Sequence, residues 1–173
     1  MQRVMIVGGS GSGKSTLARF LGVRTGLPVY HMDHIHWTPG WVARATPERK
    51  AMALKIEESP KWIFEGGFST TYDHRATRAD CLIWLDLPVS LRLWRVTYRM
   101  LRYYGRQRPD MAEGCQEGLH SETAEFYRWI WRTRSSHRAR LVRLIQDHPH
   151  LNVHQLTKTA QVTSFMDSFA VKP

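Results

Sequence analysis

The residues best suited to chemistry stand near the amino end, where glycines alternate with serines before a lysine. The segment Gly8-Gly-Ser-Gly-Ser-Gly-Lys-Ser15 fits G-x-x-x-x-G-K-[ST], the phosphate-binding P-loop pattern. Glycines let the backbone curl so that successive N–H groups converge on an anion, and a following helix presents further N–H groups to the same phosphates. Lys14 would reach the β- and γ-phosphates and the Ser15 hydroxyl would ligate Mg²⁺. The alternative is a flexible glycine turn between a strand and a helix. The residues predicted to bind ATP are Ser10, Gly11, Ser12, Gly13, Lys14, Ser15 and Thr16.

A magnesium ion in such a loop also needs a nearby carboxylate, usually at the end of another strand. The candidates are Asp33, Glu65 and Asp86. In Trp62-Ile-Phe-Glu-Gly-Gly67 a hydrophobic run ends in an acid, as expected of the strand beside the P-loop. We therefore predict that Ser15 and Glu65 hold the metal, Glu65 through a metal-bound water. The alternative for Glu65 is a surface carboxylate at a strand end. Asp86 is interpreted as a structural residue near the next helix start.

Asp33 stands in an unusual cluster, His31-Met-Asp-His-Ile-His36. Three histidines and an acid within six residues suggest a metal site, because imidazole is a common zinc ligand. On an extended segment, however, His34 and His36 would lie on one face and Asp33 on the other, which spreads the ligands apart. We favour Asp33 alone as a catalytic group, at the carboxyl edge of a sheet beside the γ-phosphate. There it could accept a proton from an attacking hydroxyl.

Two further residues are expected to border the phosphoryl acceptor together with Asp33. Trp41 and its neighbour Trp37 flank a Pro-Gly turn, where their rings could stack on a substrate or could anchor the loop by aromatic packing. Arg75 is placed with them as a substrate-binding residue, because the acceptor is expected between the Asp33 loop, Arg75 and a lid.

Arginines supply the remaining candidates for catalysis. Four of them recur at spacings of three, four and three residues, on one face of a helix: Arg92, Arg95, Arg99 and Arg102. Arg106 and Arg108 follow Gly105 in a segment that is expected to form a mobile lid. Phosphoryl transfer spreads negative charge over the transferring group, and one well-placed arginine is worth a factor of about 10³ to 10⁵ in rate. We predict catalytic roles for Arg99, Arg106 and Arg108, and a solvated basic face for some of the others.

Composition sets the limits within which these residues act. The chain has 173 residues, 25 Lys and Arg against 15 Asp and Glu, and a formal net charge of +10. Residues 92–143 carry +7 of that excess, which implies a polyanionic partner, either a nucleotide or a nucleic acid. Two cysteines and no CxxC pattern favour a reducing, cytoplasmic setting. An apolar run of four residues at the start is too short for a signal peptide, and no run is long enough to span a membrane.

Short apolar runs alternate with helical stretches along the chain. The expected strands are 3–7, 27–31, 62–65, 81–87 and 151–156. The expected helices are 14–24, 46–59 with Thr46 as its cap, 88–104, 121–147 and 159–170. Such alternation predicts an α/β fold, with a parallel sheet covered by helices on both faces in one domain over residues 1–173.

Six segments together carry a resemblance to a known group of proteins: 8–16, 30–33, 37–41, 63–67, 78–88 and 105–111. On them the chain resembles the P-loop kinases that include adenylate, shikimate and gluconate kinases, and within this group the DNA topology modulation protein (FlaR-related) family. The resemblance implies a five-stranded parallel sheet in the order 2-3-1-4-5, ATP with Mg²⁺, and a lid at about residues 105–120. It also implies that Asp33 matches the acid that meets a hydroxyl substrate in shikimate kinase. After Glu65, however, the chain lacks the Gly-Phe-Pro-Arg segment of adenylate kinases.

Two functions of different classes follow from these observations. The first is a kinase that transfers the γ-phosphoryl of ATP to a hydroxyl or phosphate of a small molecule. The alternative is an ATP-regulated nucleic-acid-binding protein affecting DNA topology, for which residues 128–143 supply six arginines interleaved with Trp129 and Trp131. A nucleotide-dependent switch would differ from the kinase only in lacking phosphoryl transfer. The acceptor, the choice between ATP and GTP, and the oligomeric state stay open.

Overall fold

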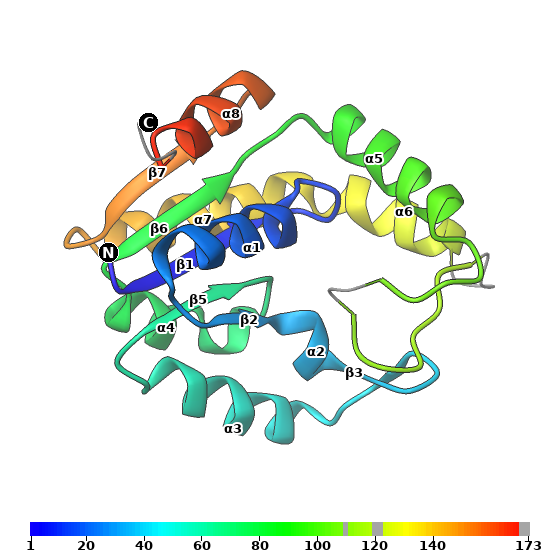
Figure 1. Cartoon of the computed structure of the whole chain (residues 1–173), viewed down its shortest axis with the longest axis horizontal. Helices are drawn as coiled ribbons and strands as arrows, with labels where there is room; N and C mark the ends of the chain where they lie inside the picture. The colour runs from blue at the N-terminus through cyan, green and yellow to red at the C-terminus, as the bar shows by residue number, and fades with distance from the viewer. Residues whose placement is uncertain (109–110, 119–122, 170–173) are drawn as a thin grey trace.

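A five-stranded parallel sheet forms the centre of the molecule (Figure 1). The computed structural model describes residues 1–108, 111–118 and 123–169. In spatial order the strands are β2 (Val29–His31), β5 (Trp62–Glu65), β1 (Arg3–Gly8), β6 (Cys81–Leu85) and β7 (Asn152–Leu156). Every neighbouring pair is parallel. Counted among the strands of this sheet, the order is 2-3-1-4-5, so the predicted fold class is confirmed.

Helices cover both faces of the sheet and the site is built at one edge. They are α1 (Lys14–Thr25), α2 (Met32–His36), α3 (Thr46–Glu57), α4 (Tyr72–Arg78), α5 (Val89–Arg102), α6 (Thr123–Arg132), α7 (Arg134–Asp147) and α8 (Thr159–Asp167). A 3-10 turn (Ser69–Thr71) precedes α4, and β3 (Trp37–Thr38) pairs with β4 (Val42–Ala43) as a separate antiparallel hairpin.

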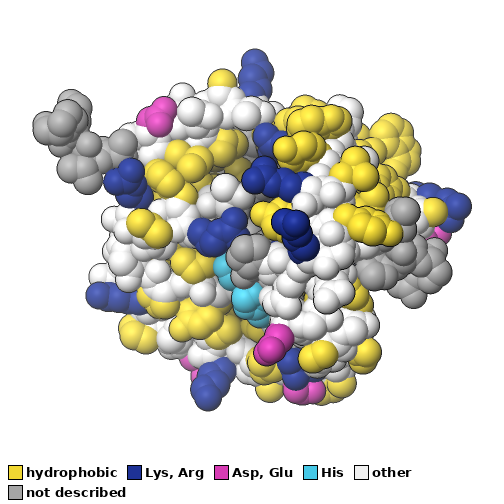
Figure 2. Space-filling model, turned by 45° about the vertical axis from the view of Figure 1, so that its right-hand side comes forward, with side chains coloured by type: hydrophobic (Ala, Val, Ile, Leu, Met, Phe, Trp, Pro, Cys, Tyr) yellow, Lys and Arg dark blue, Asp and Glu magenta, His cyan; other side chains and the backbone are white. Residues whose placement is uncertain are grey.

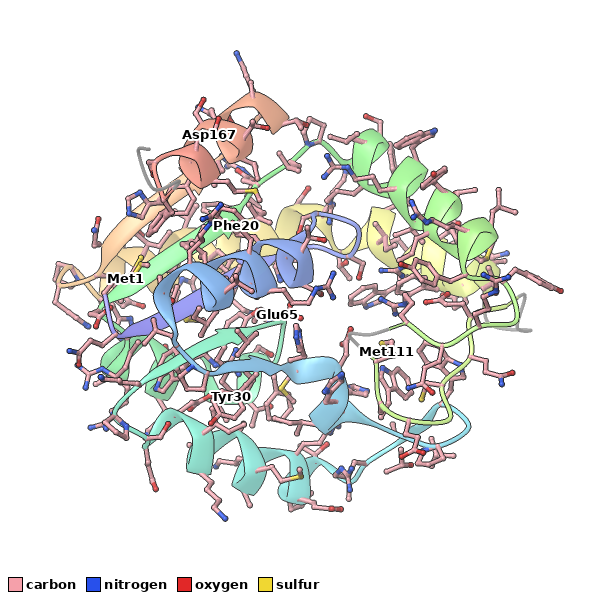
Figure 3. The ribbon with its side chains drawn as sticks, in the orientation of Figure 1. Met1, Phe20, Tyr30, Glu65, Met111 and Asp167 are labelled. Carbon is pink, nitrogen blue, oxygen red and sulfur yellow. The ribbon has the colours of Figure 1, made fainter. Side chains whose placement is uncertain are left out.

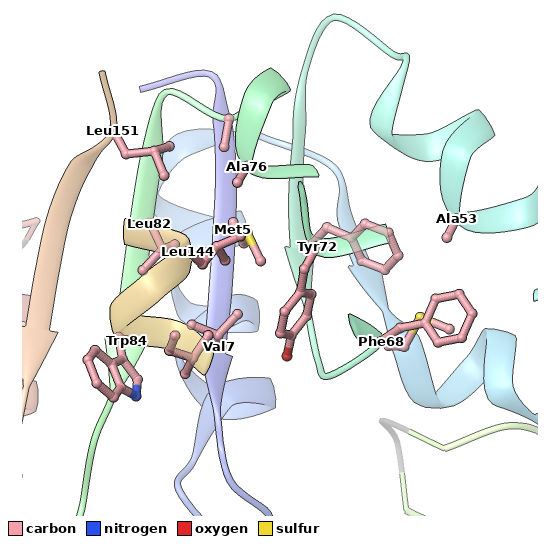
Figure 4. Close-up of a cluster of buried hydrophobic side chains, with 14 of the residues drawn as sticks. Met5, Val7, Ala53, Phe68, Tyr72, Ala76, Leu82, Trp84, Leu144 and Leu151 are labelled. Atoms are coloured by element: carbon pink, nitrogen blue, oxygen red, sulfur yellow. The ribbon is translucent and has the colours of Figure 1, made fainter. Parts of the chain in front are cut away.

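The core divides into two clusters because successive residues of a strand point to opposite faces. In β1, Val4 and Ile6 join the cluster that contains Leu17 and Leu21 of α1. Met5 and Val7 join the other, which includes Tyr72 and Ala76 of α4 and Leu141 and Leu144 of α7. Figure 4 shows this second cluster, in which side chains from the sheet meet those of the helices that cover it. Both faces of the central strands are therefore dry, as a covered parallel sheet requires.

His31 ends β2, but residues 32–36 do not continue the extended segment that we expected. They form the short helix α2, whose buried residues Met32 and Ile35 are three positions apart, the spacing of one helix face. Gly66 lies against this helix, since a Cβ there would come within 2.6 Å of the Met32 Cβ. The faces predicted for Asp33, His34 and His36 by alternation were therefore wrong.

The long helix expected over 121–147 is two helices that meet at Thr133. The Thr133 hydroxyl donates to the Trp129 carbonyl at 2.7 Å, a back-bond that bends helices. At the start of α3, Thr46 is the first helical residue and Ala45 the cap, so the predicted Thr46 cap is also corrected. Residues 121–122 and 170, which we expected to be helical, lie outside the described part of the chain, as do lid residues 109–110 and 119–120.

A buried ion pair fastens α3 to α4 and to the end of β5. Glu57 and Arg75 are both fully buried, and Arg75 Nε donates to Glu57 Oε1 at 2.9 Å. The same oxygen accepts from Thr71 at 2.8 Å, while Arg75 Nη1 donates to the Gly66 carbonyl at 3.1 Å. Because each charge meets a partner, the pair is tolerated in the core and holds the backbone that follows Glu65.

Glu57→Gln is expected to lower the free energy of unfolding by about 3–5 kcal/mol, because it leaves the Arg75 cation buried without its counter-charge. Urea denaturation followed by circular dichroism measures this change. The matched control is Glu58→Gln at the next, exposed position, where a change within about 0.5 kcal/mol is expected. A Glu57→Gln protein as stable as the control would contradict the structural role of the pair.

Candidate active site

The P-loop connects β1 to α1 as a tight curl. Gly8, Gly11 and Gly13 have φ values of 151°, 79° and 95°, a region that residues with a side chain rarely adopt. The Ser12 N–H closes the turn onto the Gly9 carbonyl at 3.1 Å. Helix α1 begins at Lys14 directly after the loop and has no side-chain cap, so its first N–H groups lack intrahelical acceptors. The Lys14 ammonium donates to the Gly9 carbonyl at 3.3 Å and thus folds back over the loop.

Glu65 joins the P-loop to the neighbouring strands at the carboxyl edge of the sheet. Its Oε1 accepts a hydrogen bond from the Ser15 hydroxyl at 2.9 Å and lies 2.7 Å from Nδ1 of His31. The register explains this meeting, because Glu65 stands beside Ile6 of β1 on one side and His31 of β2 on the other. Figure 3 shows Glu65 in the middle of the molecule, between α1 and α2.

The surroundings of Glu65 keep its carboxyl ionised. Burial raises the pKa of this carboxyl, but the hydrogen bond from His31, the charge of Lys14 and the Ser15 hydroxyl together outweigh it, and the net pKa lies below its ordinary value. Because Glu65 is a carboxylate, His31 Nδ1 must carry the proton of their hydrogen bond. Sequence reasoning missed His31 as a site residue; the available signal was its position at the end of a strand, two residues before Asp33.

Asp33 lies on α2 within the field of the other candidate residues. Burial raises the pKa of its carboxyl and so does the charge of Glu65, while Lys14, Arg108 and Arg99 act in the opposite direction. The net pKa is raised, which brings the group closer to the range in which a carboxylate takes up a proton near neutral pH. The fold therefore brings together residues that are up to 94 positions apart in the chain.

The described residues between α5 and α6, 103–108 and 111–118, include two of the arginines predicted to be catalytic, Arg106 and Arg108. Glu117 forms an ion pair with the buried Arg108. It forms a second ion pair with Arg99, in which Glu117 Oε1 lies 3.8 Å from Arg99 Nε. Arg106 is exposed, and its backbone pairs with Glu117. Of the three arginines predicted to be catalytic, Arg108 and Arg99 thus share one carboxylate, while the side chain of Arg106 faces solvent.

Trp41 ties the β3–β4 hairpin to the same segment. Its ring N–H donates to the Gln116 carbonyl at 2.8 Å, and the Gly40 N–H donates to the Gly114 carbonyl at 3.1 Å. The Trp41 ring also meets Trp37 edge to face, with 5.5 Å between ring centroids. These contacts match the loop-anchoring alternative for the two tryptophans.

A cavity of about 710 Å³ opens between α2, the hairpin and the segment after α5. It is lined by His34, Trp37, Thr38, Pro39, Arg44, Gln107, Met111, Ala112 and Glu113. Figure 2 shows one face of the molecule, with Lys and Arg side chains gathered near its middle above histidine side chains. Asp33 precedes His34 on α2 and is not one of the residues that line the cavity.

Arg75 does not border this space. Its guanidinium is fully buried and donates to Glu57, Gly66 and Thr71. It also packs over the Phe64 ring, with 3.8 Å between Cζ and the ring centroid. The prediction that Arg75 binds substrate is therefore corrected: each of its three nitrogens donates to a protein acceptor, the side chain is fully buried, and it supports the loop after β5 from within the core.

The donor set at the P-loop fits magnesium and not a histidine-rich metal site. In the described part of the chain, no three His, Cys, Asp or Glu side chains are grouped so as to hold a metal ion. Magnesium prefers oxygen ligands and keeps several of its waters, so one hydroxyl and one carboxylate acting through water are sufficient. Ser15 and Glu65 offer these two groups, already hydrogen-bonded to each other.

Comparison with known structures shows the class of fold. A shikimate kinase from Acinetobacter baumannii, in complex with shikimate, superposes with a TM-score of 0.58 over 99% of this chain and 96% of that one, at 16% identity. A shikimate kinase from Bacteroides thetaiotaomicron gives 0.58 at 15% identity, over 96% and 95% of the two chains. A deoxyadenosine kinase from M. mycoides with bound dATP gives 0.52 at 12% identity, over 97% and 98%. The chain therefore has the same fold as these shikimate kinases and this deoxyadenosine kinase.

At the level of sequence the similarity is to a protein without an assigned activity. The uncharacterized protein YqaC of Bacillus subtilis (strain 168) is 31% identical over 110 residues, which are 61% of this chain and 61% of YqaC. No protein-family model matches the chain. None of the helices within the described ranges is both long and apolar enough to cross a membrane.

The opposite pKa directions of the two site carboxyls predict opposite effects of neutralising them. Because the pKa of Asp33 is raised in the folded state, its ionised form opposes folding once the pH exceeds the ordinary value of 3.8. Asp33→Asn should therefore raise the melting temperature at pH 7, and the gain should vanish as the pH falls toward 4. Glu65→Gln should lower the melting temperature at pH 7, because an ionised group with a depressed pKa stabilises the fold.

Thermal denaturation between pH 4 and pH 8 measures both effects. Asp73→Asn on the exposed side of α4 is the control and should leave the curve of the parent unchanged. A destabilised Asp33→Asn protein at pH 7 would show that Asp33 does not lie in the field described above.

Proposed function

We propose that this protein is an ATP-dependent phosphotransferase that moves the γ-phosphoryl group of ATP to a hydroxyl or phosphate of a small molecule. One observation carries the proposal: the P-loop serine is hydrogen-bonded to an ionised acid at the carboxyl edge of the sheet, with Lys14 and Asp33 in the same electrostatic field. A nucleotide triphosphate and its metal need this combination of groups. The kinase fold supports the same class of reaction.

In this proposal each part of the loop has one task. The backbone of residues 10–16 would surround the phosphates, and Lys14, now on the Gly9 carbonyl, would turn to the β- and γ-phosphates. Ser15 would ligate Mg²⁺ through its hydroxyl oxygen while its hydrogen still points to Glu65, whose carboxylate would also hold a metal-bound water. Bound magnesium supplies charge neutralisation for the transferring group.

Asp33 would orient the acceptor hydroxyl and take its proton. A carboxyl with a raised pKa is a better base near neutral pH than an ordinary aspartate, because its proton affinity is higher. The acceptor would lie in the cavity between α2, the hairpin and residues 105–118, with Trp41 holding that wall in place. The identity of this acceptor would be found by a thermal-shift screen with an ATP analogue and Mg²⁺.

Arg106 and Arg108 would act from a lid at about residues 105–120 of a single domain, and Arg99 would act from α5. Glu117 now neutralises Arg108 and Arg99. Phosphoryl oxygens would offer these two cations a stronger bidentate partner, so a bound nucleotide could draw them away from Glu117. Arg106, exposed at the start of the lid, would approach when the lid closes. Cys81 and Cys115 are buried free thiols, which agrees with the reducing, cytoplasmic setting proposed for the chain.

Lys14→Ala is expected to abolish ATP turnover with the selected acceptor and to leave the melting temperature close to that of the parent, since Lys14 makes a single 3.3 Å contact in the unliganded protein. A coupled assay of ADP release measures turnover. Lys61→Ala, an exposed lysine beside β5, is the control and should retain full activity. Equal turnover in the Lys14→Ala protein and the parent would refute the kinase assignment.

ATP-regulated binding of nucleic acid, with an effect on DNA topology as the FlaR-related resemblance implies, is a second candidate that one surface feature favours. Aromatic rings stand exposed on α5 and α6, among them Trp94, Trp129 and Trp131 with 62%, 51% and 50% of their surface accessible. The Arg134 guanidinium lies over the Trp131 ring, 4.3 Å from its centroid. Exposed aromatic rings beside arginines are suited to stacking on unpaired bases.

For this second function, Trp129→Ala with Trp131→Ala should weaken binding of a fluorescent single-stranded oligonucleotide by about 10-fold or more, in keeping with about 1–3 kcal/mol per stacked base. Fluorescence anisotropy at several salt concentrations measures it. Affinity at physiological salt no higher than that of an unrelated basic protein would remove this function from consideration.

A further inference from the structure

The first turn of α5 packs directly onto the P-loop without side chains between them. A Cβ at Gly11 would lie 2.3 Å from the Arg92 carbonyl oxygen and 3.0 Å from Cγ2 of Val96. Only a glycine at this position allows the two backbones to come so close. The start of α5 is therefore in close backbone contact with the loop, and this contact positions the residues of the turn beside the phosphate-binding backbone.

The side chain of Arg92 extends from this turn over Gly9. A Cβ built on Gly9 would lie 1.4 Å from Arg92 Nη1 and 2.6 Å from Cζ, so the space that a side chain would fill is occupied by the guanidinium. The carbonyl of the same Gly9 accepts the hydrogen bond from Lys14. Two cations thus meet at one residue of the loop, one from α1 and one from α5.

Nothing in the described part of the chain pairs with the Arg92 guanidinium. Arg92 is 9% exposed, and its Nε is buried without a hydrogen-bond partner. Burial lowers its pKa, and Asp86 only partly offsets this effect. Asp86 Oδ2 accepts hydrogen bonds from Arg138 Nε at 3.1 Å and from Gln155 Nε2 at 2.8 Å, so this oxygen is bonded to residues other than Arg92. A buried and unpaired cation is costly, and Arg92 contrasts with the fully buried Arg75, whose charge is matched by Glu57.

The surroundings make this position still less favourable for a cation that has no ligand. Arg92 is the fourth residue of α5, near the helix end that carries the positive end of the dipole. His137 of α7 lies in the same field: burial and the charges of Lys14, Arg92 and Arg140 lower its pKa to about 4, so it is neutral at physiological pH. An anion bound here would offset the positive charges of Arg92 and Lys14 and the positive end of the α5 dipole.

We propose that Arg92 is an anion-binding residue of this active site, which donates its guanidinium hydrogens to a phosphate or carboxylate oxygen bound beside Gly9. The proposal rests on the proposed function, because the P-loop is taken to hold a nucleotide. The anion has two sources with the same chemistry: the phosphate tail of the nucleotide, or an anionic group of the acceptor. A planar guanidinium with free nitrogens is suited to bidentate contact with either.

The test replaces Arg92 by methionine, an unbranched apolar residue without the charge. Isothermal titration with tripolyphosphate on the free protein, and with inorganic phosphate on the protein saturated with ADP and Mg²⁺, should show affinity about 10- to 100-fold weaker in one or both titrations. A loss with tripolyphosphate identifies the nucleotide tail as the source, and a loss confined to inorganic phosphate identifies the acceptor group. Arg102→Met, an exposed arginine on the last turn of α5, is the control and should change neither.

A second readout separates ligand binding from a structural role. Because the unliganded protein bears the cost of an unpaired buried cation, the melting temperature of Arg92→Met without ligand should equal or exceed that of the parent. Arg92→Lys, which keeps the charge but not the planar fork, should give intermediate affinities.

Unchanged affinities of Arg92→Met in both titrations would overturn the proposal, whatever the melting temperature of this variant. The kinase assignment would stay intact. Failure of the parent protein to bind tripolyphosphate saturably would instead refute the proposed function itself.

Discussion

The site depends on the hydrogen bond between Ser15 and Glu65, because this contact joins the phosphate-binding loop to the strand beside it. It exists because β5 lies next to β1 in the sheet, so that the last residue of β5 stands where the P-loop turns into α1. His31, at the end of β2, completes the contact from the other side. Parallel strands share one carboxyl edge, and the order of these three strands alone decides which polar residues meet there.

Within the described residues, the buried arginine side chains have partners of opposite charge, and Arg92 is the exception. Glu57 matches Arg75, and Glu117 matches Arg108 and Arg99, so that these cations are tolerated away from water. The first pair holds the backbone after β5, and the second holds the segment that covers the site. Arg92 has no such match among the described residues, and its guanidinium lies over Gly9 of the P-loop. A bound anion would supply the partner that this buried charge lacks.

The fold places the arginines of residues 92–143 in several different surroundings. Arg92 and Arg95 face the P-loop, Arg95 through a 3.3 Å hydrogen bond to the Ser12 carbonyl. Arg99 and Arg108 meet Glu117, and Arg138 meets Asp86. Others, such as Arg128 and Arg132, stand in solvent beside exposed aromatic rings. A net charge of +7 over this stretch therefore does not describe one surface, and the two proposed ligands, a nucleotide and a nucleic acid, would contact different members of it.

The sequence by itself determined the features that depend on neighbours in the chain: the glycine spacing of the P-loop, the apolar runs of the five sheet strands and the acid at the end of β5. These were predicted because a motif or a strand is written in consecutive residues, and the strand order came from the resemblance those segments carry. Only the tertiary structure decided that Arg75 is enclosed by Glu57, that Arg92 covers Gly9, that His31 meets Glu65 and that residues 32–36 are helical against Gly66. Each of these depends on a partner from another element, and spacing along one segment carries no information about which distant residue will lie beside it.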